Sequence, residues 1–175
     1  MRVTQRCAII FDGANCEISI QKYFHNSRLF INFDVLLPKL VLDRELIKLI
    51  YVTSDKRRAA MSDKLKRRLR DKFNGIVIAS VGNEDMELAI SSIEVAGKVD
   101  TIIIVSGDGD YVRLAEHLKT KGCNVEIASV KGSTSGRLVD ISDRYYKIKE
   151  SDVFDYTQPQ NDFPNPTQTN QTTNE

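Results

Sequence analysis

The segment Thr101–Leu114, TIIIVSGDGDYVRL, joins a β-branched run to a helical pattern. The run shows no alternation of polar and apolar residues, which is typical of a strand covered on both faces in a parallel sheet. Its two glycines allow a tight turn, so Asp108 and Asp110 are expected just beyond the carboxyl end of the strand. Open α/β sheets bind their ligands at this edge.

A second apolar run, Cys7–Phe11, ends in the same way, with Asp12 followed by glycine. Two buried strands that each end in Asp-Gly predict carboxylates at one edge of one sheet. A purely local interpretation stays open, in which Asp110 is a helix N-cap and Asp108 a turn residue.

Strands and helices alternate along most of the chain. This order predicts a three-layer α/β/α sandwich with a mostly parallel central sheet, of the Rossmann-like kind. Strands are expected at residues 7–11, 47–53, 76–81, 101–105, 125–130 and 146–148, and helices at 15–24, 35–42, 56–73, 85–96, 111–121 and 137–141. Residues 25–33 are expected to be irregular.

Two helices have apolar residues at helical spacing. In the helix at 15–24 the expected inward residues are Ile18, Ile20 and Phe24. In the helix at 85–96 the expected apolar face consists of Met86, Ala89, Ile90, Ile93 and Ala96.

Composition favours one globular domain at residues 1–150 and a polar tail at 151–175, which is expected to be disordered from Thr157 onward. The net charge of +1 requires any nucleic-acid binding to come from local patches. Three cysteines at unrelated spacings favour reduced thiols buried in the core. With no long apolar segment, we expect a cytoplasmic protein without membrane partners.

The helix expected at 56–73 has a strong excess of positive charge. It holds nine of the 25 basic residues of the chain, beside an apolar stripe of Met61, Leu65, Leu69 and Phe73. Such a charge run is often only a solvated face, but clustered Lys and Arg also favour binding to a polyanion. The candidate residues for binding such a polyanion are Arg57, Arg58, Lys64, Arg67 and Arg68.

If the first and fourth strands are neighbours, Asp12, Asp108 and Asp110 lie close together. Asp85, at the start of a helix, would face the same edge, although an acidic residue there also complements the helix dipole. A group of carboxylates without His or Cys favours Mg²⁺ or Mn²⁺, which suits phosphodiester hydrolysis. The neighbouring residues Asn15, Ser106 and Arg113 are candidates for orienting the phosphate or the carboxylates.

Several segments together resemble the NYN domain, LabA-like branch, of the PIN-like nuclease superfamily. They are FDGAN at 11–15, DMELA at 85–89, SGDGDY at 106–111, GCNV at 122–125 and DRY at 143–145. The resemblance spans residues 5–150 and implies a metal-dependent ribonuclease with Asp12, Asp85, Asp108 and Asp110 as candidate catalytic residues and metal ligands. Ser91 departs from the family pattern, where many members have a further aspartate.

The first hypothesis is therefore a Mg²⁺- or Mn²⁺-dependent ribonuclease that acts on single-stranded or structured RNA. The alternative is a catalytically weakened member that serves as an RNA-binding or regulatory adaptor, and Ser91 motivates it. A phosphorylated receiver-like domain fits less well, because the strand at 76–81 ends in Gly82-Asn83 and not in an acceptor aspartate. A dinucleotide site is weaker still, because the GDGD turn is negatively charged where a phosphate would bind. The sequence leaves a homo-oligomer or a protein partner open.

Overall fold

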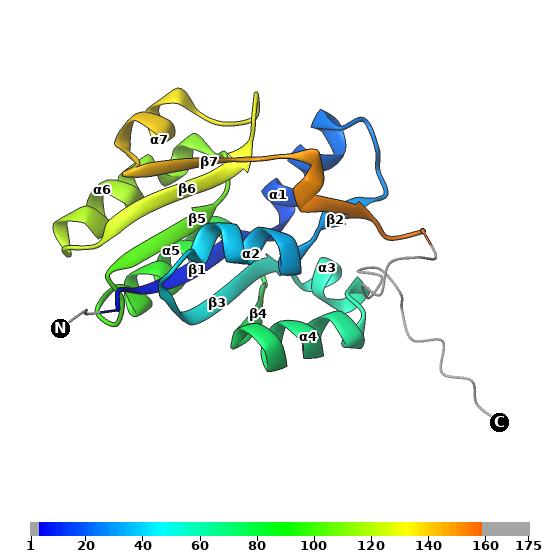
Figure 1. Cartoon of the computed structure of the whole chain (residues 1–175), viewed down its shortest axis with the longest axis horizontal. Helices are drawn as coiled ribbons and strands as arrows, with labels where there is room; N and C mark the ends of the chain where they lie inside the picture. The colour runs from blue at the N-terminus through cyan, green and yellow to red at the C-terminus, as the bar shows by residue number, and fades with distance from the viewer. Residues whose placement is uncertain (1–3, 159–175) are drawn as a thin grey trace.

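A computed structural model describes residues 4–158, and its centre is a parallel six-stranded sheet in the order β4-β3-β1-β5-β6-β7 (Figure 1). The strands are β1 (Arg6–Asp12), β3 (Glu45–Ser54), β4 (Gly75–Ser80), β5 (Thr101–Val105), β6 (Asn124–Val130) and β7 (Arg144–Ile148). The predicted α/β sandwich with a mostly parallel sheet is confirmed.

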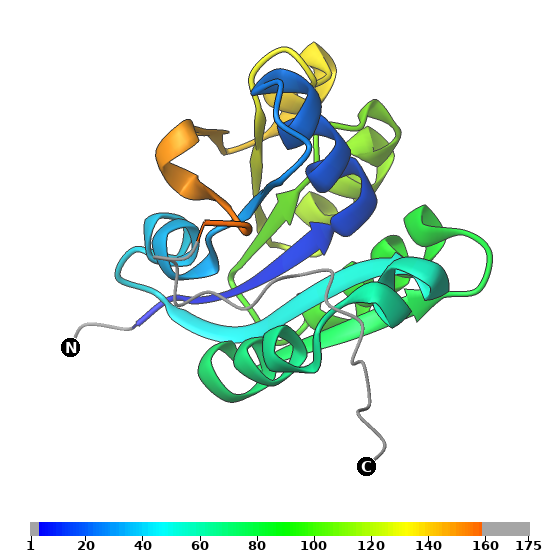
Figure 2. The ribbon, with the colours of Figure 1, turned by 90° about the vertical axis from the view of Figure 1, so that its right-hand side faces the viewer.

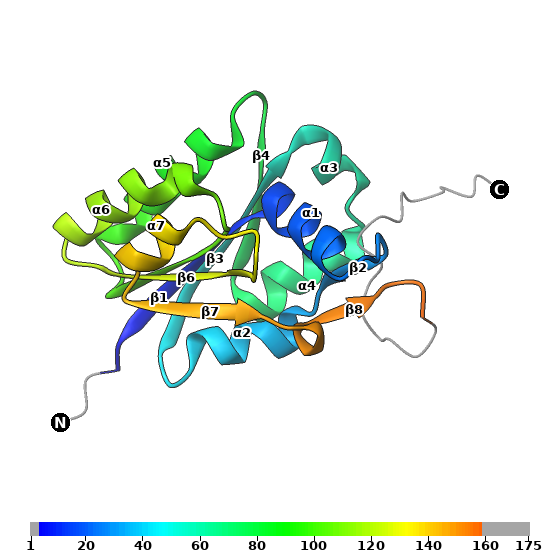
Figure 3. The same ribbon diagram turned by 90° about the horizontal axis from the view of Figure 1, so that it is seen from above.

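Helices cover both faces of the sheet (Figure 3). One face packs against α1 (Gly13–Tyr23), α2 (Phe33–Val41) and α4 (Asp63–Phe73), and the other against α5 (Glu84–Ala96), α6 (Val112–Thr120) and α7 (Gly136–Ile141). The strand residues alternate between these layers. Ile9 and Phe11 join the first core, and Ala8 and Ile10 join the second. All three cysteines are buried and unbridged, as predicted.

The prediction of one continuous helix at residues 56–73 is wrong, because the structure has two helices there, α3 (Asp55–Ala60) and α4. Met61 adopts an extended conformation with ψ of 133°, and the Ser62 hydroxyl accepts a hydrogen bond from the Leu65 N–H at 3.2 Å. Ser62 is thus a helix N-cap within the apolar stripe. The stripe itself faces the core, with Met61, Leu65 and Leu69 buried.

Most of the residues that were predicted to form the inward face of α5 point outward instead. Leu88, Ser91 and Val95 are buried, whereas Met86 and Ile90 are exposed, as is Ile93. The helix has two apolar stripes, and only one of them can face the sheet. In α1, Ile20 is buried and Phe24 is partly buried, but Ile18 is exposed.

A two-stranded antiparallel sheet extends the fold beyond the predicted boundary at residue 150. β2 (Leu29–Ile31) lies in the stretch expected to be irregular, and it pairs with β8 (Val153–Asp155). Two short 3₁₀ helices, η1 (Gly109–Tyr111) and η2 (Glu150–Asp152), complete the secondary structure. Asp152 is fully buried and accepts hydrogen bonds from the Tyr146 hydroxyl at 3.0 Å and the Lys149 N–H at 2.8 Å. The first residues of the predicted polar tail therefore belong to the folded domain, and the rest of that tail lies outside the described residues.

Among residues 4–158, no helix has the length and apolar character needed to cross a membrane.

Candidate active site

The candidate site lies where β1 and β5 end side by side. Phe11 pairs with Val105, so Asp12 and Ser106 are the adjoining residues on the two strands. The chain leaves β1 into α1 on one face and β5 into α6 on the other, which makes this position the topological switch point of the sheet. Figure 2 shows the blue strand β1 beside the green strand β5, with the helix α1 continuing from the end of β1.

Asp12 is 5% exposed and is surrounded by hydrogen-bond donors. One carboxylate oxygen accepts from the Asn15 N–H at 3.0 Å, which caps α1. The other accepts from the hydroxyls of Ser106 and Tyr111, both at 3.1 Å. Burial raises the pKa of Asp12 above its ordinary value, although these hydrogen bonds act in the opposite direction.

Tyr111 links the two carboxylates that the sequence placed on different elements. Its hydroxyl lies 2.7 Å from Oδ1 of Asp85 in the first turn of α5 and 3.1 Å from Oδ2 of Asp12. Its ring is buried in η1, and burial together with the two carboxylates strongly raises its pKa, so the phenol stays protonated. Sequence reasoning assigned this residue no role. The available signal was a tyrosine directly after the GDGD turn.

Asp108 and Asp110 have different local environments. Asp108 is half-buried, and its carboxylate accepts the Asp110 N–H at 3.0 Å as the N-cap of η1. The Asp108 N–H donates to the Ser106 hydroxyl at 3.2 Å, which connects the turn to Asp12. The side chain of Asp110 is exposed. The local interpretation of the sequence gave the N-cap role to Asp110 and a turn role to Asp108, whereas in the structure Asp108 is the N-cap.

Asn15 and Gly107 connect α1 with the turn after β5. Oδ1 of Asn15 accepts the Gly107 N–H at 3.3 Å, so the amide nitrogen of the side chain faces away from that bond. A Cβ atom on Gly107 would lie 2.3 Å from the carbonyl oxygen of Ser133. Only glycine allows the turns after β5 and β6 to approach this closely.

Another acidic side chain, Glu17, lies on α1 two residues after Asn15. It accepts hydrogen bonds from the Tyr51 hydroxyl at 2.5 Å and from Arg57 at 2.7 Å. Burial raises the pKa of Glu17, and its two donors oppose that rise. The sequence analysis did not identify this residue, because its partners come from two other elements.

The predicted basic surface is divided between paired and exposed residues. Arg57 pairs with Glu17, and Arg68 pairs with Asp34. Arg58, Lys64 and Arg67 are exposed. Arg113 lies on α6, is exposed and pairs with Glu116 at 2.6 Å, near Asp85 and Asp110 in a shallow groove between α5 and α6.

The donor atoms at this edge are carboxylate, amide and hydroxyl oxygens. Mg²⁺ and Mn²⁺ prefer such ligands, and Mg²⁺ is often held by one or two carboxylates with water in its other positions. The Asp12 and Asp85 pair fits this requirement. Within the described part of the chain, no group of three or more His, Cys, Asp or Glu side chains is arranged to hold a metal ion. Of the four predicted carboxylates, Asp12 and Asp85 share the Tyr111 hydroxyl, and the turn that carries Asp108 is linked to Asp12 through Ser106.

Comparison with known proteins identifies the family. Residues 6–149 match the NYN domain. The chain belongs to the NYN domain family. Because this is a PIN-like nuclease family, membership supports a ribonuclease-like function in general and RNA as the class of partner. NYN and PIN-like nucleases typically depend on divalent metal ions.

Two relatives extend the comparison. The chain is 27% identical to the low amplitude and bright protein LabA of Synechococcus elongatus, in an alignment that covers 83% of this chain and 84% of that protein. The crystal structure of a protein of unknown function from Vibrio parahaemolyticus RIMD 2210633 superposes with a TM-score of 0.71 at 22% identity. The superposition covers 88% of this chain and 100% of the Vibrio protein chain. This structural likeness supports the fold alone.

Proposed function

We propose that this NYN domain is a ribonuclease that hydrolyses RNA phosphodiester bonds beside Asp12 and Asp85, with Mg²⁺ or Mn²⁺ as its cofactor. The observation that carries the proposal is the Tyr111 hydroxyl, which brings two carboxylates from β1 and α5 together at the switch point. Two neighbouring carboxylates repel each other, and a cation bound between them would relieve that repulsion further than the Tyr111 hydroxyl alone.

Asp12 and Asp85 would hold the metal ion. When bound, the ion would neutralise charge on the phosphate and make water a better nucleophile. Asp108 and Asp110 are further candidates for this role, because the turn that carries them is linked to Asp12 through Ser106.

The other residues at this edge would position the reactants. Ser106 and the Asn15 N–H fix the orientation of the Asp12 carboxylate. The free amide of Asn15 and the exposed Arg113 can donate to phosphate oxygens. Tyr111 keeps its proton and orients both carboxylates, so in our proposal it is a positioning residue.

The exposed cations of α3 and α4 would attract the RNA. Arg58, Lys64 and Arg67 are the members of the predicted surface that face solvent, whereas Arg57 and Arg68 already neutralise carboxylates of this chain. We therefore expect the first three to contribute more to RNA affinity than the other two.

The test is cleavage of labelled single-stranded and hairpin RNAs in Mg²⁺, Mn²⁺ or EDTA. Asp85→Asn and Asp108→Asn are compared with Asp140→Asn, which changes an exposed aspartate on α7. We expect metal-dependent cleavage that Asp85→Asn abolishes and Asp140→Asn leaves intact. Cleavage that is unaffected by Asp85→Asn would refute the assignment of the site.

A second candidate function is a catalytically weakened RNA-binding or regulatory adaptor. The capping role of Asp108, and the lack of a third metal-ligating side chain beside the pair among residues 4–158, favour it. Tight RNA binding without cleavage under any metal condition would support this function and exclude the first.

A further inference from the structure

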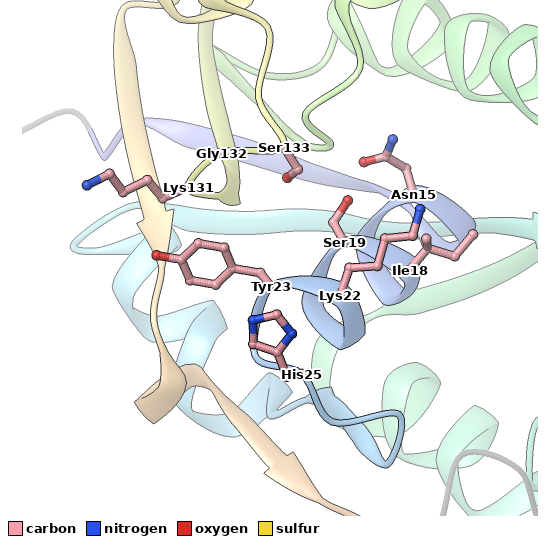
Figure 4. A pocket seen from close by; sticks show the side chains of 9 residues that line it. All are labelled: Asn15, Ile18, Ser19, Lys22, Tyr23, His25, Lys131, Gly132 and Ser133. Carbon is pink, nitrogen blue, oxygen red and sulfur yellow. The ribbon is translucent and has the colours of Figure 1, made fainter.

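A groove of about 580 Å³ lies beside the candidate active site, between α1 and the turn that follows β6 (Figure 4). We call it the α1 groove and define it by Asn15, Ile18, Lys22, Tyr23, His25 and Lys131. Its volume lies within the range of sites that bind small molecules and cofactors, so it can accommodate a nucleotide. None of the functions assigned above uses it.

The α1 groove adjoins the candidate active site at Asn15. Asn15 lines the groove, and its side chain accepts the Gly107 N–H in the turn that carries Asp108. On the other side, the carbonyl oxygen of Gly107 accepts the Ser135 N–H at 2.9 Å, which ties the turn after β6 to the same residue. The groove thus shares Asn15 with the site and lies against the turn that carries Asp108.

The charge of the α1 groove complements a phosphate backbone. Lys22 and Lys131 line it, both are exposed, and neither forms an ion pair with another described residue. Among the described residues that line it, none is acidic. Two cations next to an acidic pair would hold the phosphates that flank a metal-bound one.

The α1 groove also presents an aromatic surface. Tyr23 is 45% exposed, and Ile18 beside it is 39% exposed. The Tyr23 ring packs against the Phe24 ring at 88° with 5.0 Å between centroids, which helps to fix its orientation. In Figure 4 the ring reaches across the groove toward the side of Lys131. Cations combined with an accessible aromatic ring are the usual elements of single-strand binding sites.

We propose that the α1 groove binds an unpaired nucleotide of single-stranded RNA next to the scissile phosphate. A base stacks on Tyr23, and Lys22 and Lys131 contact the adjoining phosphates. The position of the scissile phosphate rests on the ribonuclease function proposed above. In duplex RNA the bases already stack on each other and cannot offer a face to Tyr23, so the groove selects single strands.

The experiment measures binding of fluorescein-labelled oligouridine by anisotropy, in EDTA so that no cleavage occurs. We expect Tyr23→Ala to weaken binding by about 5- to 150-fold, the usual range for one stacked base, and Tyr23→Phe to retain it. The double variant Lys22→Ala with Lys131→Ala should lower the salt dependence of log K by about 1.4, or about 0.7 for each lost phosphate contact. The matched control replaces Lys98 and Lys121, two exposed lysines at the opposite edge of the sheet, and should change neither quantity.

Three outcomes would overturn the proposal. They are unchanged affinity in Tyr23→Ala, equal effects of the groove and control lysine pairs, and duplex RNA binding as tightly as the single strand. These binding measurements test the groove separately from the proposed ribonuclease function. A chain that binds oligouridine through Tyr23 but never cleaves refutes the ribonuclease function alone, whereas a chain that cleaves RNA with unchanged Tyr23→Ala affinity refutes the groove alone.

Discussion

Replacing Asp12 by Asn should abolish cleavage and, in EDTA, make the folded domain more stable. The carboxylate is almost completely buried, and burial raises its pKa despite three hydrogen bonds. Asn can keep these contacts, because its oxygen can cap α1 at the Asn15 N–H while its amide donates to the hydroxyls of Ser106 and Tyr111. The substitution thus removes a buried charge with little change of shape.

The sign and the size follow from the raised pKa. An aspartate in an unfolded chain has a pKa of about 3.9, and the pKa of folded Asp12 is higher. At a pH between these two values the native state therefore binds more protons than the unfolded state. Stability therefore falls as pH rises through this window, and the loss is complete above the folded pKa. Each unit of pKa difference contributes about 1.4 kcal/mol, and about 1 kcal/mol corresponds to roughly 2–4 °C in Tm for a domain of this size.

The assay is urea unfolding followed by circular dichroism across the acidic to neutral range, in EDTA. Asp143→Asn is the control with the opposite sign. Burial acts to raise the pKa of Asp143, but hydrogen bonds from Lys119 and the Val125 N–H outweigh it, and the pKa is lowered. Its contribution is present above the unfolded pKa and lost as pH falls through the folded one, so Asp143→Asn should destabilise at neutral pH. An Asp12→Asn variant less stable than the wild type at neutral pH would refute the reasoning.

Three further substitutions probe the same edge. Tyr111→Phe removes the hydroxyl shared by the two carboxylates and should cost about 1.5–3 kcal/mol, the usual value of a hydrogen bond to a charged group, with a shifted pH–rate profile as the diagnostic readout. Gly107→Ala places a methyl group 2.3 Å from the Ser133 carbonyl oxygen. The melting temperature should therefore be lower than that of the wild type, and the RNA affinity should fall with it. Ser91→Asp should not create activity, because Ser91 is 4% exposed on the sheet side of α5 and lies about 9 Å along the helix axis from Asp85. The variant should instead have a free energy of unfolding that is lower by at least about 2 kcal/mol, because it buries a charge.

The sequence predicted the architecture because its central strands are uninterrupted apolar runs. The runs that became β1 and β5 are buried on both sides of the sheet, and the Asp12 and Ser106 positions follow from their parallel pairing. In contrast, the pairing of β2 with β8 joins residues more than a hundred positions apart. Short strands at the edge of a fold have weak local signals, which is why the predicted domain boundary came too early.

The details of the site depend on where α5 starts and which of its faces points inward. Asn83 caps this helix by accepting the Met86 N–H at 3.1 Å. With this start, Leu88 and Val95 face the sheet and Asp85 faces Tyr111. The competing stripe of Met86, Ile90 and Ile93 has an equally good helical period, so periodicity alone could not choose between the two faces. The role of Tyr111 could not be predicted for the same reason, since its partner Asp85 arrives through tertiary packing.

The Ser91 departure from the family pattern has a different meaning once the helix is placed. A residue on the buried side of α5, two turns beyond Asp85, would not add a ligand to the Asp12 and Asp85 pair without a change in the helix. The argument for a weakened enzyme therefore shifts from Ser91 to Asp108, whose carboxylate caps η1 instead of joining the pair. Whether Asp108→Asn abolishes cleavage is consequently a sharper test of the alternative function than restoring an acid at position 91.

Charge distribution connects the site with its substrate. At a net charge of +1, long-range attraction is weak, and an RNA must be held by local cations. The α1 groove supplies two beside the acidic pair, and the exposed arginines and lysine of α3 and α4 lie on the same face of the sheet as α1. The two regions differ in one respect that binding data can separate, because the α1 groove offers the 45% exposed Tyr23 side chain and should therefore distinguish single strands from duplexes.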